Sequence, residues 1–333
     1  MTTVAQQSEC FLAALVNRRR NPVKPATIQA YQRWLGKWIV PHLGALELAS
    51  VDNGIMKKFV DFLVESELAP ATIRSIAGAL KAVVGSEIDA NGNKLHLRDW
   101  NEIYIDAPQV DPSAQNTPAA TDLQVNTALR SASPQYQVFY AIQAASGCRI
   151  GEMMALRMGP DTGSGSFLDL DKSVLFVRSA MAAIERVEQS PKSAAGMREV
   201  DLHETIIDWL RVKITHSPFH RKAGELLFQN ETGGFMHQTT LRENFERDGL
   251  PPSHSLRRFR TTHLVNMSVP APLVDYWTGH KGKTMTDRYT MLESSLEARK
   301  NWCRRAGLGF QLPSAMDNTI VGDLYKQDLQ EVL

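Results

Sequence analysis

Residues 254–290 read HSLRRFRTTHLVNMSVPAPLVDYWTGHKGKTMTDRYT. This stretch combines a basic helical turn, a Gly-His pair and a tyrosine near its end. His254 and Arg257 are three positions apart, so a helix places both on one face. The pattern fits either a charged helical surface or a chemical site, and the other motifs of the chain decide between the two.

The composition allows many functions and excludes few. The chain has 333 residues, which is enough for two domains that each bury a core. Its 37 basic residues nearly balance its 36 acidic ones, so it lacks the overall basic excess of many nucleic-acid-binding domains. A local basic face can still bind DNA, because only the field at the contact matters.

Targeting signals are absent from the sequence pattern. The cysteines, Cys10, Cys148 and Cys303, are far apart and form no CxxC pair, as is usual in a reducing compartment. The first residues lack the basic and apolar regions of a signal peptide, and no apolar run approaches the ~20 residues that span a bilayer. We therefore expect a cytoplasmic protein with no membrane partner.

The first third of the chain has helical periodicity. Apolar residues recur at helical spacing within 27–44, 53–69 and 69–88, and Pro41 is expected to end the first helix. No strand pattern appears before about residue 95. The first domain is therefore predicted to be entirely helical.

A change of composition marks the domain boundary. The segment 106–122 is rich in Pro, Ala, Ser and Asp and has no periodicity. We assign a helical domain to 1–106, a linker to 107–120, a second domain to 121–313 and a tail to 314–333.

The second domain is predicted to mix helices with a small sheet. Thr121 or Asp122 provides a helix N-cap, and an apolar helix breaks at Ser146-Gly147 and restarts near Arg149. Three stretches with β-branched residues and alternation then predict an antiparallel sheet: 173–180, 183–190 and 197–203. Helical patterns return from residue 204, so the fold class is mainly α with a small antiparallel β-sheet.

Four short motifs contain residue types that carry chemistry. They are SGCRIGE with Arg149 and Glu152, SPKSAAGMRE with Lys192, HSLR with His254 and Arg257, and TGHKGKTMTDRY with His280 and Tyr289. Each has an ordinary interpretation, because a surface arginine usually forms a weak ion pair and a tyrosine commonly packs its ring and leaves its hydroxyl in water. Likewise, a hairpin lysine is usually solvated and a histidine after glycine often belongs to the core.

Taken together, the motifs suit cleavage of a phosphodiester through a covalent intermediate. Tyr289 supplies a nucleophile, although a phenol with a pKa near 10 needs help to lose its proton. Arg149 and Arg257 can grip the phosphoryl oxygens in bidentate fashion as negative charge develops. The two histidines can donate hydrogen bonds or take the tyrosine proton, and Lys192 can protonate the leaving oxygen.

These motifs, in this order, resemble those of the tyrosine recombinases, also called the phage integrase family. The helical stretch KPATIQAYQRWLGKWIVPHLGALEL and the later LAPATIRSIAGALKAVV resemble the core-binding domain of that family, so the resemblance covers about residues 11–305. It implies that Glu152 is a structural support and that six residues are catalytic: Arg149, Lys192, His254, Arg257, His280 and the nucleophile Tyr289. Lys172 is the other lysine near the expected hairpin, and Thr278 stands where leucine is frequent in the family, which we expect to be a harmless packing change.

The resemblance also implies a fold and an assembly. Residues 1–106 would form the core-binding domain and 121–313 the catalytic domain of a two-domain, C-shaped clamp around duplex DNA. A homotetramer would cut and rejoin two DNA sites through 3′-phosphotyrosyl bonds and a Holliday junction, without a cofactor, inside a bacterial host and on its nucleoid. An accessory DNA-bending protein is a possible partner, and the tail, 314–333, would dock on a neighbouring protomer or fold on its own domain. Since the helical pattern starts within the first dozen residues, no additional arm-binding domain is expected before it.

DNA contacts outside the reaction centre are predicted from local basic clusters and helix starts. Phosphate contacts of this kind position a protein on DNA and do not read its sequence. The candidates are Arg18, Arg19, Arg20, Lys24, Thr72, Arg74, Arg258 and Arg260. For the first four, a solvated basic turn explains the pattern equally well.

Other functions remain open at this point. A chromosome- or plasmid-dimer-resolving recombinase uses the same residues, and a relaxing topoisomerase shares the chemistry. A non-catalytic DNA-binding regulator would be expected to lack one of Arg149, Arg257 or Tyr289, and all three are present. A metal-dependent nuclease is disfavoured because the sequence shows no tight carboxylate or histidine cluster, so no metal is expected.

Overall fold

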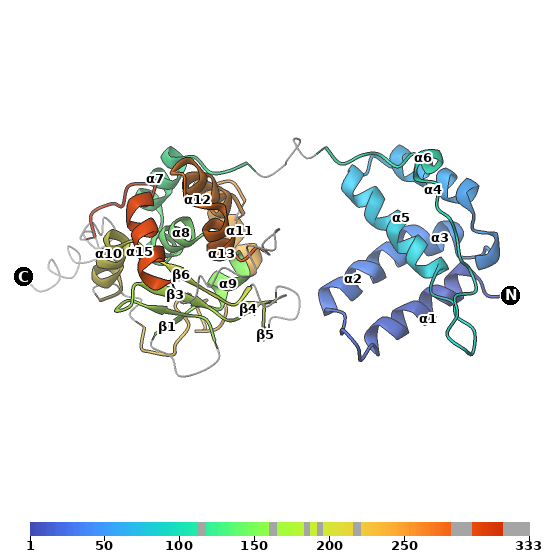
Figure 1. Cartoon of the computed structure of the whole chain (residues 1–333), viewed down its shortest axis with the longest axis horizontal. Helices are drawn as coiled ribbons and strands as arrows, with labels where there is room; N and C mark the ends of the chain where they lie inside the picture. Colours follow the sequence, from blue (N-terminus) through green and yellow to red (C-terminus); the bar gives the residue numbers. More distant parts are fainter. Residues whose placement is uncertain are drawn as a thin grey trace, which may run out of the picture. The chain divides into compact units, whose positions relative to one another are not determined.

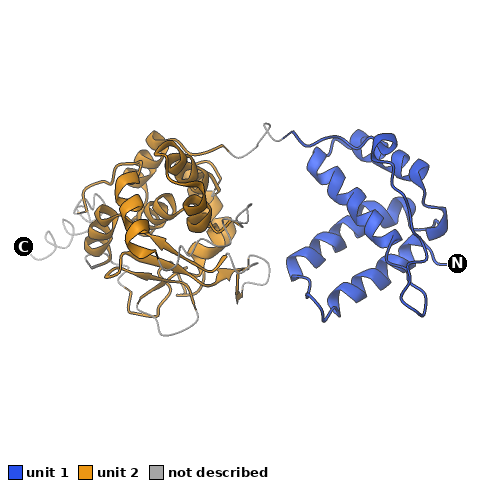
Figure 2. Cartoon of the chain, in the orientation of Figure 1, with its two compact units in different colours: residues 1–115 blue, residues 116–333 orange. Residues whose placement is uncertain are grey.

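The computed structural model describes residues 1–111, 118–159, 165–182, 187–191, 196–215, 221–252, 254–280 and 295–315. The chain divides into two compact units, 1–115 and 116–333, which Figure 2 colours separately. The division falls inside the segment 107–120 that we expected to be a linker. Each unit has its own cluster of buried apolar residues.

The described residues of the first unit form helices joined by loops, with isolated β-bridges at Thr3–Glu47 and Ile88–Lys94. Its helices are α1 (Val4–Val16), α2 (Pro25–Trp34), the π turn η1 (Leu35–Ile39), α3 (Val40–Leu43), the 3-10 turn η2 (Leu48–Ser50), α4 (Asn53–Glu65), α5 (Pro70–Val84) and α6 (Glu102–Ile105). Side chains from the apolar faces of α4 and α5 supply much of the core, among them Met56, Val60, Ile76 and Leu80.

The prediction that Pro41 ends a helix was wrong. The chain remains helical from α2 through η1 to the end of α3 at Leu43. Proline cannot donate the usual backbone hydrogen bond, and its ring collides with the carbonyl four residues before it. The wider π turn immediately before α3 changes the hydrogen-bond register there, so the helical path continues through the proline.

The second unit combines helices with two small sheets (Figure 1). The helices are α7 (Asp122–Ser131), α8 (Pro134–Ser146), α9 (Ile150–Met154), α10 (Glu204–Thr215), α11 (Gln238–Arg247), α12 (His254–Asn266), α13 (Ala271–Thr278) and α15 (Leu296–Ala306). The strands are β1 (Arg157–Met158), β2 (Phe167–Asp169), β3 (Val174–Val177), β4 (Ala180–Met181), β5 (Glu188–Gln189) and β6 (Arg198–Asp201). The fold class, mainly α with a small sheet, is confirmed.

The larger sheet differs from the predicted one in detail. Its order is β1-β2-β3-β6, and β1 pairs in parallel with β2, whereas the other neighbours are antiparallel. Strands β1 and β2 were not predicted, because they are two and three residues long and too short for alternation to be recognised. Of the predicted strand 183–190, the described residues 187–190 include β5, which pairs with β4 in a separate ribbon.

Helix α8 forms the centre of the second unit. All residues from Gln137 to Ser146 are buried, and the helix packs against α7, α10 and α12. Thr121, one of the two expected N-cap residues, caps the preceding α7 and forms a capping box with Gln124. Because α8 is fixed on several sides, its C-terminal end is a rigid point from which the next residues are placed.

Candidate active site

A sharp change of direction after α8 places the first candidate residue. Gly147 adopts a left-handed conformation with φ 69°, which glycine reaches without a Cβ collision, and the chain then begins α9 with Arg149 at the N-cap. This is the break and restart that the sequence predicted. Arg149 remains partly accessible, with 41% of its side chain exposed.

The second candidate arginine lies deeper. Arg257 is in the first turn of α12 and is only 2% exposed. Its Nη1 donates to the carbonyl oxygen of Gly147 at 2.8 Å, and its Nη2 donates to the carbonyl oxygen of Thr278. Arg257 therefore ties α12 to the end of α8 and to the end of α13.

The end of α13 organises three arginines. Helix α13 stops at Gly279, which has a left-handed φ of 66°, and the last carbonyls of a helix lack partners within it. Three consecutive carbonyl oxygens, here named the α13 carbonyl platform, each accept a hydrogen bond from a different arginine. Trp277 O accepts from Arg198 Nε at 2.7 Å, Thr278 O from Arg257 Nη2, and Gly279 O from Arg149 Nη2 at 3.3 Å.

A buried ion pair supports this arrangement. The carboxylate of Glu152 accepts from Arg149 Nη1 at 3.0 Å and from Arg198 Nη2 at 2.9 Å. Burial opposes ionisation of Glu152, but the hydrogen bonds and charge of Arg198 outweigh it and hold the pKa of the carboxyl below its usual value. Glu152 therefore acts as the fixed counter-ion that holds both arginines in place.

Arg198 is a site residue that no sequence motif indicated. The residue follows the expected hairpin turn on β6, and its side chain is buried, as are those of Val200 and Asp201. Because side chains alternate along a strand, residues 198 and 200 lie on the same face. Arg198 therefore lies on the same buried face as Val200. An arginine on a buried face needs a buried partner. This requirement is the feature of the sequence that could have indicated Arg198.

His280 directly follows the α13 carbonyl platform. Its Nε2 lies 3.0 Å from Arg257 Nη2, and a guanidinium only donates, so Nε2 must be the acceptor. The proton is then on Nδ1, which lies 3.1 Å from the hydroxyl of Thr278, while that hydroxyl donates to the carbonyl of Val274. Arg257 thus selects the tautomer of His280, and the hydroxyl of Thr278 accepts from its Nδ1 with the carboxylate of Asp275 3.5 Å away. The threonine therefore makes a polar contact in addition to the packing change we expected.

The charges around the site favour a bound anion. Partial desolvation, followed by the positive charges of Arg257 and Arg149, lowers the pKa of His280 from its ordinary value. Desolvation and then the charges of Arg257 and Arg258 lower the pKa of His254, which is exposed at the start of α12. Burial, with the nearby charge of Arg149, lowers the pKa of Arg257 to about 10, so the guanidinium stays charged at neutral pH. A phosphate would relieve this mutual repulsion.

Two of the six predicted catalytic residues are outside the described residues. These are Lys192 and Tyr289. Hydrogen bonds to the α13 carbonyl platform and to each other link Arg149, Arg257 and His280, and, in addition to desolvation, the positive charges of Arg257 and Arg149 lower the pKa of His254. The alternative lysine, Lys172, lies in the turn between β2 and β3 and pairs with Asp169 at 3.6 Å.

The predicted DNA contacts have different surroundings. Arg258 is partly buried on α12, whereas Arg260 is buried and its Nη1 donates to the carbonyl of Gly307 at 2.7 Å. The predicted phosphate contact of Arg260 is therefore wrong, because this guanidinium instead holds the chain after α15. In the first unit, Arg18, Arg19, Arg20 and Arg74 are exposed, and Lys24 and Thr72 are partly buried.

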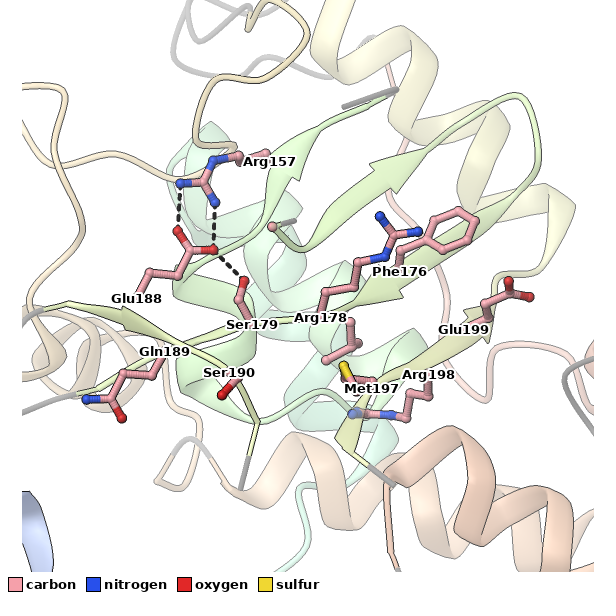
Figure 3. A pocket seen from close by; sticks show the side chains of 12 residues that line it. Arg157, Phe176, Arg178, Ser179, Glu188, Gln189, Ser190, Met197, Arg198 and Glu199 are labelled. Atoms are coloured by element: carbon pink, nitrogen blue, oxygen red, sulfur yellow. Dashed lines mark hydrogen bonds and ion pairs between the residues drawn. The ribbon is translucent and has the colours of Figure 1, made fainter. Parts of the chain in front are cut away.

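A pocket of about 870 Å³ lies beside strands β3, β5 and β6 (Figure 3). Arg157 pairs with Glu188 through two hydrogen bonds, of 2.9 and 2.7 Å, and Ser179 donates to the same carboxylate. The pocket also includes Ser190 and Met197, which flank the segment that contains Lys192. Arg198 lines this pocket, but Arg149, Arg257 and His280 do not, so we place the reaction centre at the arginine cluster around the α13 carbonyl platform.

Among the described residues, no three metal-ligating side chains of His, Cys, Asp or Glu come together. In the same part of the chain, no helix combines the length and apolar character required to cross a bilayer.

Comparisons with known proteins identify relatives. A scan against protein-family models matches the phage integrase family over residues 119–295. A search of curated proteins finds no match. Among solved structures, the integrase of transposon Tn1549 in complex with a circular intermediate DNA is 21% identical, with a TM-score of 0.64 over 90% of this chain and 100% of that one.

Lambda integrase is a second structural relative. A dimer of a lambda integrase fragment bound to a COC′ core site is 15% identical, with a TM-score of 0.58 over 86% of this chain and 95% of that one. A lambda integrase tetramer bound to a Holliday junction is 14% identical, with a TM-score of 0.56 over 86% of this chain and 79% of that one. These likenesses extend over both units. With a family match across more than half of its length, this chain belongs to the phage integrase family, the tyrosine recombinases that cut and rejoin DNA at specific sites.

Proposed function

We propose that this protein cleaves and rejoins duplex DNA through a 3′-phosphotyrosyl intermediate on Tyr289. The observation that carries the proposal is the convergence of Arg149, Arg257 and His280 around the α13 carbonyl platform. Two guanidiniums and a neighbouring imidazole, with Glu152 held by hydrogen bonds to arginines, suit a phosphoryl group that gains negative charge.

In the proposed cleavage step, the Tyr289 oxygen attacks phosphorus and the bond from phosphorus to the 5′ oxygen breaks. The tyrosine proton passes to a neutral histidine, for which His254 and His280 have suitably lowered pKa values. Lys192 protonates the departing oxygen and leaves a 5′-hydroxyl. Arg149 and Arg257 bind the non-bridging oxygens throughout. The phosphotyrosyl ester preserves the bond energy, so the reverse attack by a 5′-hydroxyl reseals DNA without ATP.

We further propose how the chain is used on DNA. Residues 1–106 form the core-binding domain, 121–313 form the catalytic domain, and four protomers act on two sites through a Holliday junction. Arg18, Arg19, Arg20, Lys24, Thr72, Arg74 and Arg258 provide DNA contacts. The lambda integrase tetramer bound to a Holliday junction supports this assembly by analogy. Integration of mobile DNA is the proposed use, and chromosome- or plasmid-dimer resolution is the alternative within the family.

Covalent trapping tests the chemistry. The protein is incubated with fragmented host genomic DNA and then denatured, and DNA that stays attached to protein is recovered and sequenced. The wild type should retain DNA that shares a common site, whereas Tyr289→Phe should bind the same DNA without a covalent link. Tyr136→Phe is the matched control, since the Tyr136 hydroxyl accepts a hydrogen bond from Asn244 at 3.0 Å on another part of the unit. Covalent attachment by Tyr289→Phe at the wild-type level would remove Tyr289 from this role.

A further inference from the structure

The α13 carbonyl platform sets the spacing of the arginines, so whatever fixes α13 also fixes them. The last carbonyls of a helix carry partial negative charge, which attracts cations. Arg149 and Arg257 reach this platform from α9 and α12, two elements that are separated by about a hundred residues of sequence. A small shift of α13 would therefore move both guanidiniums relative to each other.

Strand β6 contacts Trp277, near the end of α13, in two ways. The indole Nε1 of Trp277 donates to Asp201 Oδ2 at 2.8 Å, and both side chains are buried. Arg198, on the same strand, donates to the main-chain carbonyl of Trp277 at 2.7 Å. The two contacts hold the side chain and the backbone of one residue, which restricts both the rotation and the translation of the helix end.

A third element closes this network. Arg299 on α15 is fully buried, and its Nε donates to Asp201 Oδ2 at 2.8 Å. A single carboxylate oxygen thus accepts from both Trp277 and Arg299. The guanidinium of Arg299 also pairs with Glu199 and lies 5.4 Å from the centre of the Tyr276 ring. We name Asp201, Trp277 and Arg299 the β6 clasp.

We propose that the β6 clasp is a positioning device for strand cleavage, in which Asp201 and Trp277 act on phosphate only through the arginines they align. The expected effect on cleavage rests on the proposed function. The alignment of the arginines by the clasp does not. Neither residue is accessible to DNA, because Asp201 and Trp277 are each only 2% exposed. Their influence must therefore pass through the carbonyls of α13.

Trp277→Phe tests the clasp, because it breaks the hydrogen bond between Trp277 and Asp201. Phenylalanine keeps an aromatic ring in the core but removes the indole donor together with the volume of one fused ring, and the control variant below shares this loss of volume. Loss of Asp201 would instead leave Arg299 buried beside a reduced negative charge and unfold the unit. Trp209→Phe is the matched control. Trp209 is also buried in the second unit, and its Nε1 donates to the carbonyl of Pro313 at 2.9 Å, a contact with none of the arginines of the site.

The first measurement requires no activity. In ¹⁵N-labelled full-length protein, the Nε–Hε signals of Arg149 and Arg257 should shift in Trp277→Phe and stay unchanged in Trp209→Phe. Unchanged arginine signals in Trp277→Phe, with the fold intact, would overturn the inference whether or not the wild type cleaves DNA. If the signals shift but the wild type never forms a covalent complex, the proposed function is wrong. The alignment of the arginines by the β6 clasp is then still supported.

The second measurement uses a nicked duplex of the site recovered by covalent trapping. Because misplacement by about 1 Å can cost up to about 100-fold in rate, we expect Trp277→Phe to cleave at least about 10-fold more slowly with little change in DNA affinity. A neutral methylphosphonate at the cleaved position carries no negative charge for the arginines to bind. On that substrate the cleavage rate of the same variant should therefore fall by less than about threefold. Equal losses on both substrates would show a merely structural role, and Trp209→Phe should be near wild type on each.

Discussion

At the scale of single residues, the arginines of the site have different tasks. Arg149 is partly exposed and points one nitrogen at Glu152 and another at Gly279 O, while Arg198 is fully occupied by buried partners. Arg257 lies between these two cases, buried but adjacent to His280. The accessible Arg149 is thus best placed to grip a phosphate directly, and Arg198 is best placed to hold the others.

Arg149→Lys should separate binding from chemistry. Lysine keeps the charge but loses the planar pair of donors, and removal of one such donor typically lowers a rate by about 10²–10³-fold. We expect a loss of that size in single-turnover cleavage and a much smaller loss in DNA affinity. Arg130→Lys, on the exposed face of α7, is the control and should have no effect. A cleavage rate for Arg149→Lys within a factor of about two of wild type would contradict the assignment.

The two histidines should make DNA binding depend on pH. Both pKa values are lowered in the DNA-free protein, and a bound phosphate offsets the arginine charges that help to lower them. The pKa values therefore rise on binding, protons are taken up, and affinity should increase as pH falls from 8 to 6, by at most about tenfold per pH unit for each proton. Fluorescence anisotropy on duplex DNA can measure this slope, and His280→Asn should flatten it. Affinity that decreases over the same range would show that the linkage has the opposite sign.

At the scale of elements, two left-handed glycines end α8 and α13 and bring their last carbonyls to the arginines. Gly147 is the more informative, because a Cβ there would meet Arg260 at an ordinary contact distance of 3.5 Å. The cost of a side chain at this position is therefore backbone strain and not collision. The same change within a regular helix has the opposite sign, since glycine weakens a helix interior.

Gly147→Ala should destabilise the second unit by about 1–2 kcal/mol, the cost of a left-handed conformation for a residue with a Cβ. Gly78→Ala provides the contrast, because residue 78 lies within α5 and a Cβ there meets nothing within 4 Å. That substitution should stabilise the first unit by about 0.5–1 kcal/mol. Urea unfolding followed by circular dichroism measures both changes, and a stabilising Gly147→Ala would refute the argument.

At the scale of the whole molecule, the two units have separate cores. The cluster centred on α4 and α5 contains only residues up to Ile105, and the cluster around α8 begins at Ala120. Apolar burial is the main source of stability, so each unit contains its own driving force for folding. A single free energy of unfolding is then not expected to describe the chain.

Limited proteolysis should release two folded fragments. We expect early cleavage within residues 107–120, located by mass spectrometry, because this segment lies between the two cores. The amino-terminal fragment should keep a helical circular dichroism spectrum and unfold cooperatively on its own. A fragment that is unstructured after separation would show that its stability comes from the other unit.

The sequence by itself determined the class of fold, the helical first domain, the break after α8 and the order of the reactive motifs. These are local properties, because periodicity, capping and glycine position act over a few residues. Only the tertiary structure decided which charges share a site. Arg257 and Arg260 are three residues apart on one helix, yet one joins the α13 carbonyl platform and the other holds the chain after α15. Arg198 and the β6 clasp depend on contacts between residues far apart in the chain, and no local pattern specifies such contacts. The cost of burying a charge without a partner is what makes those distant pairings obligatory once the chain has folded.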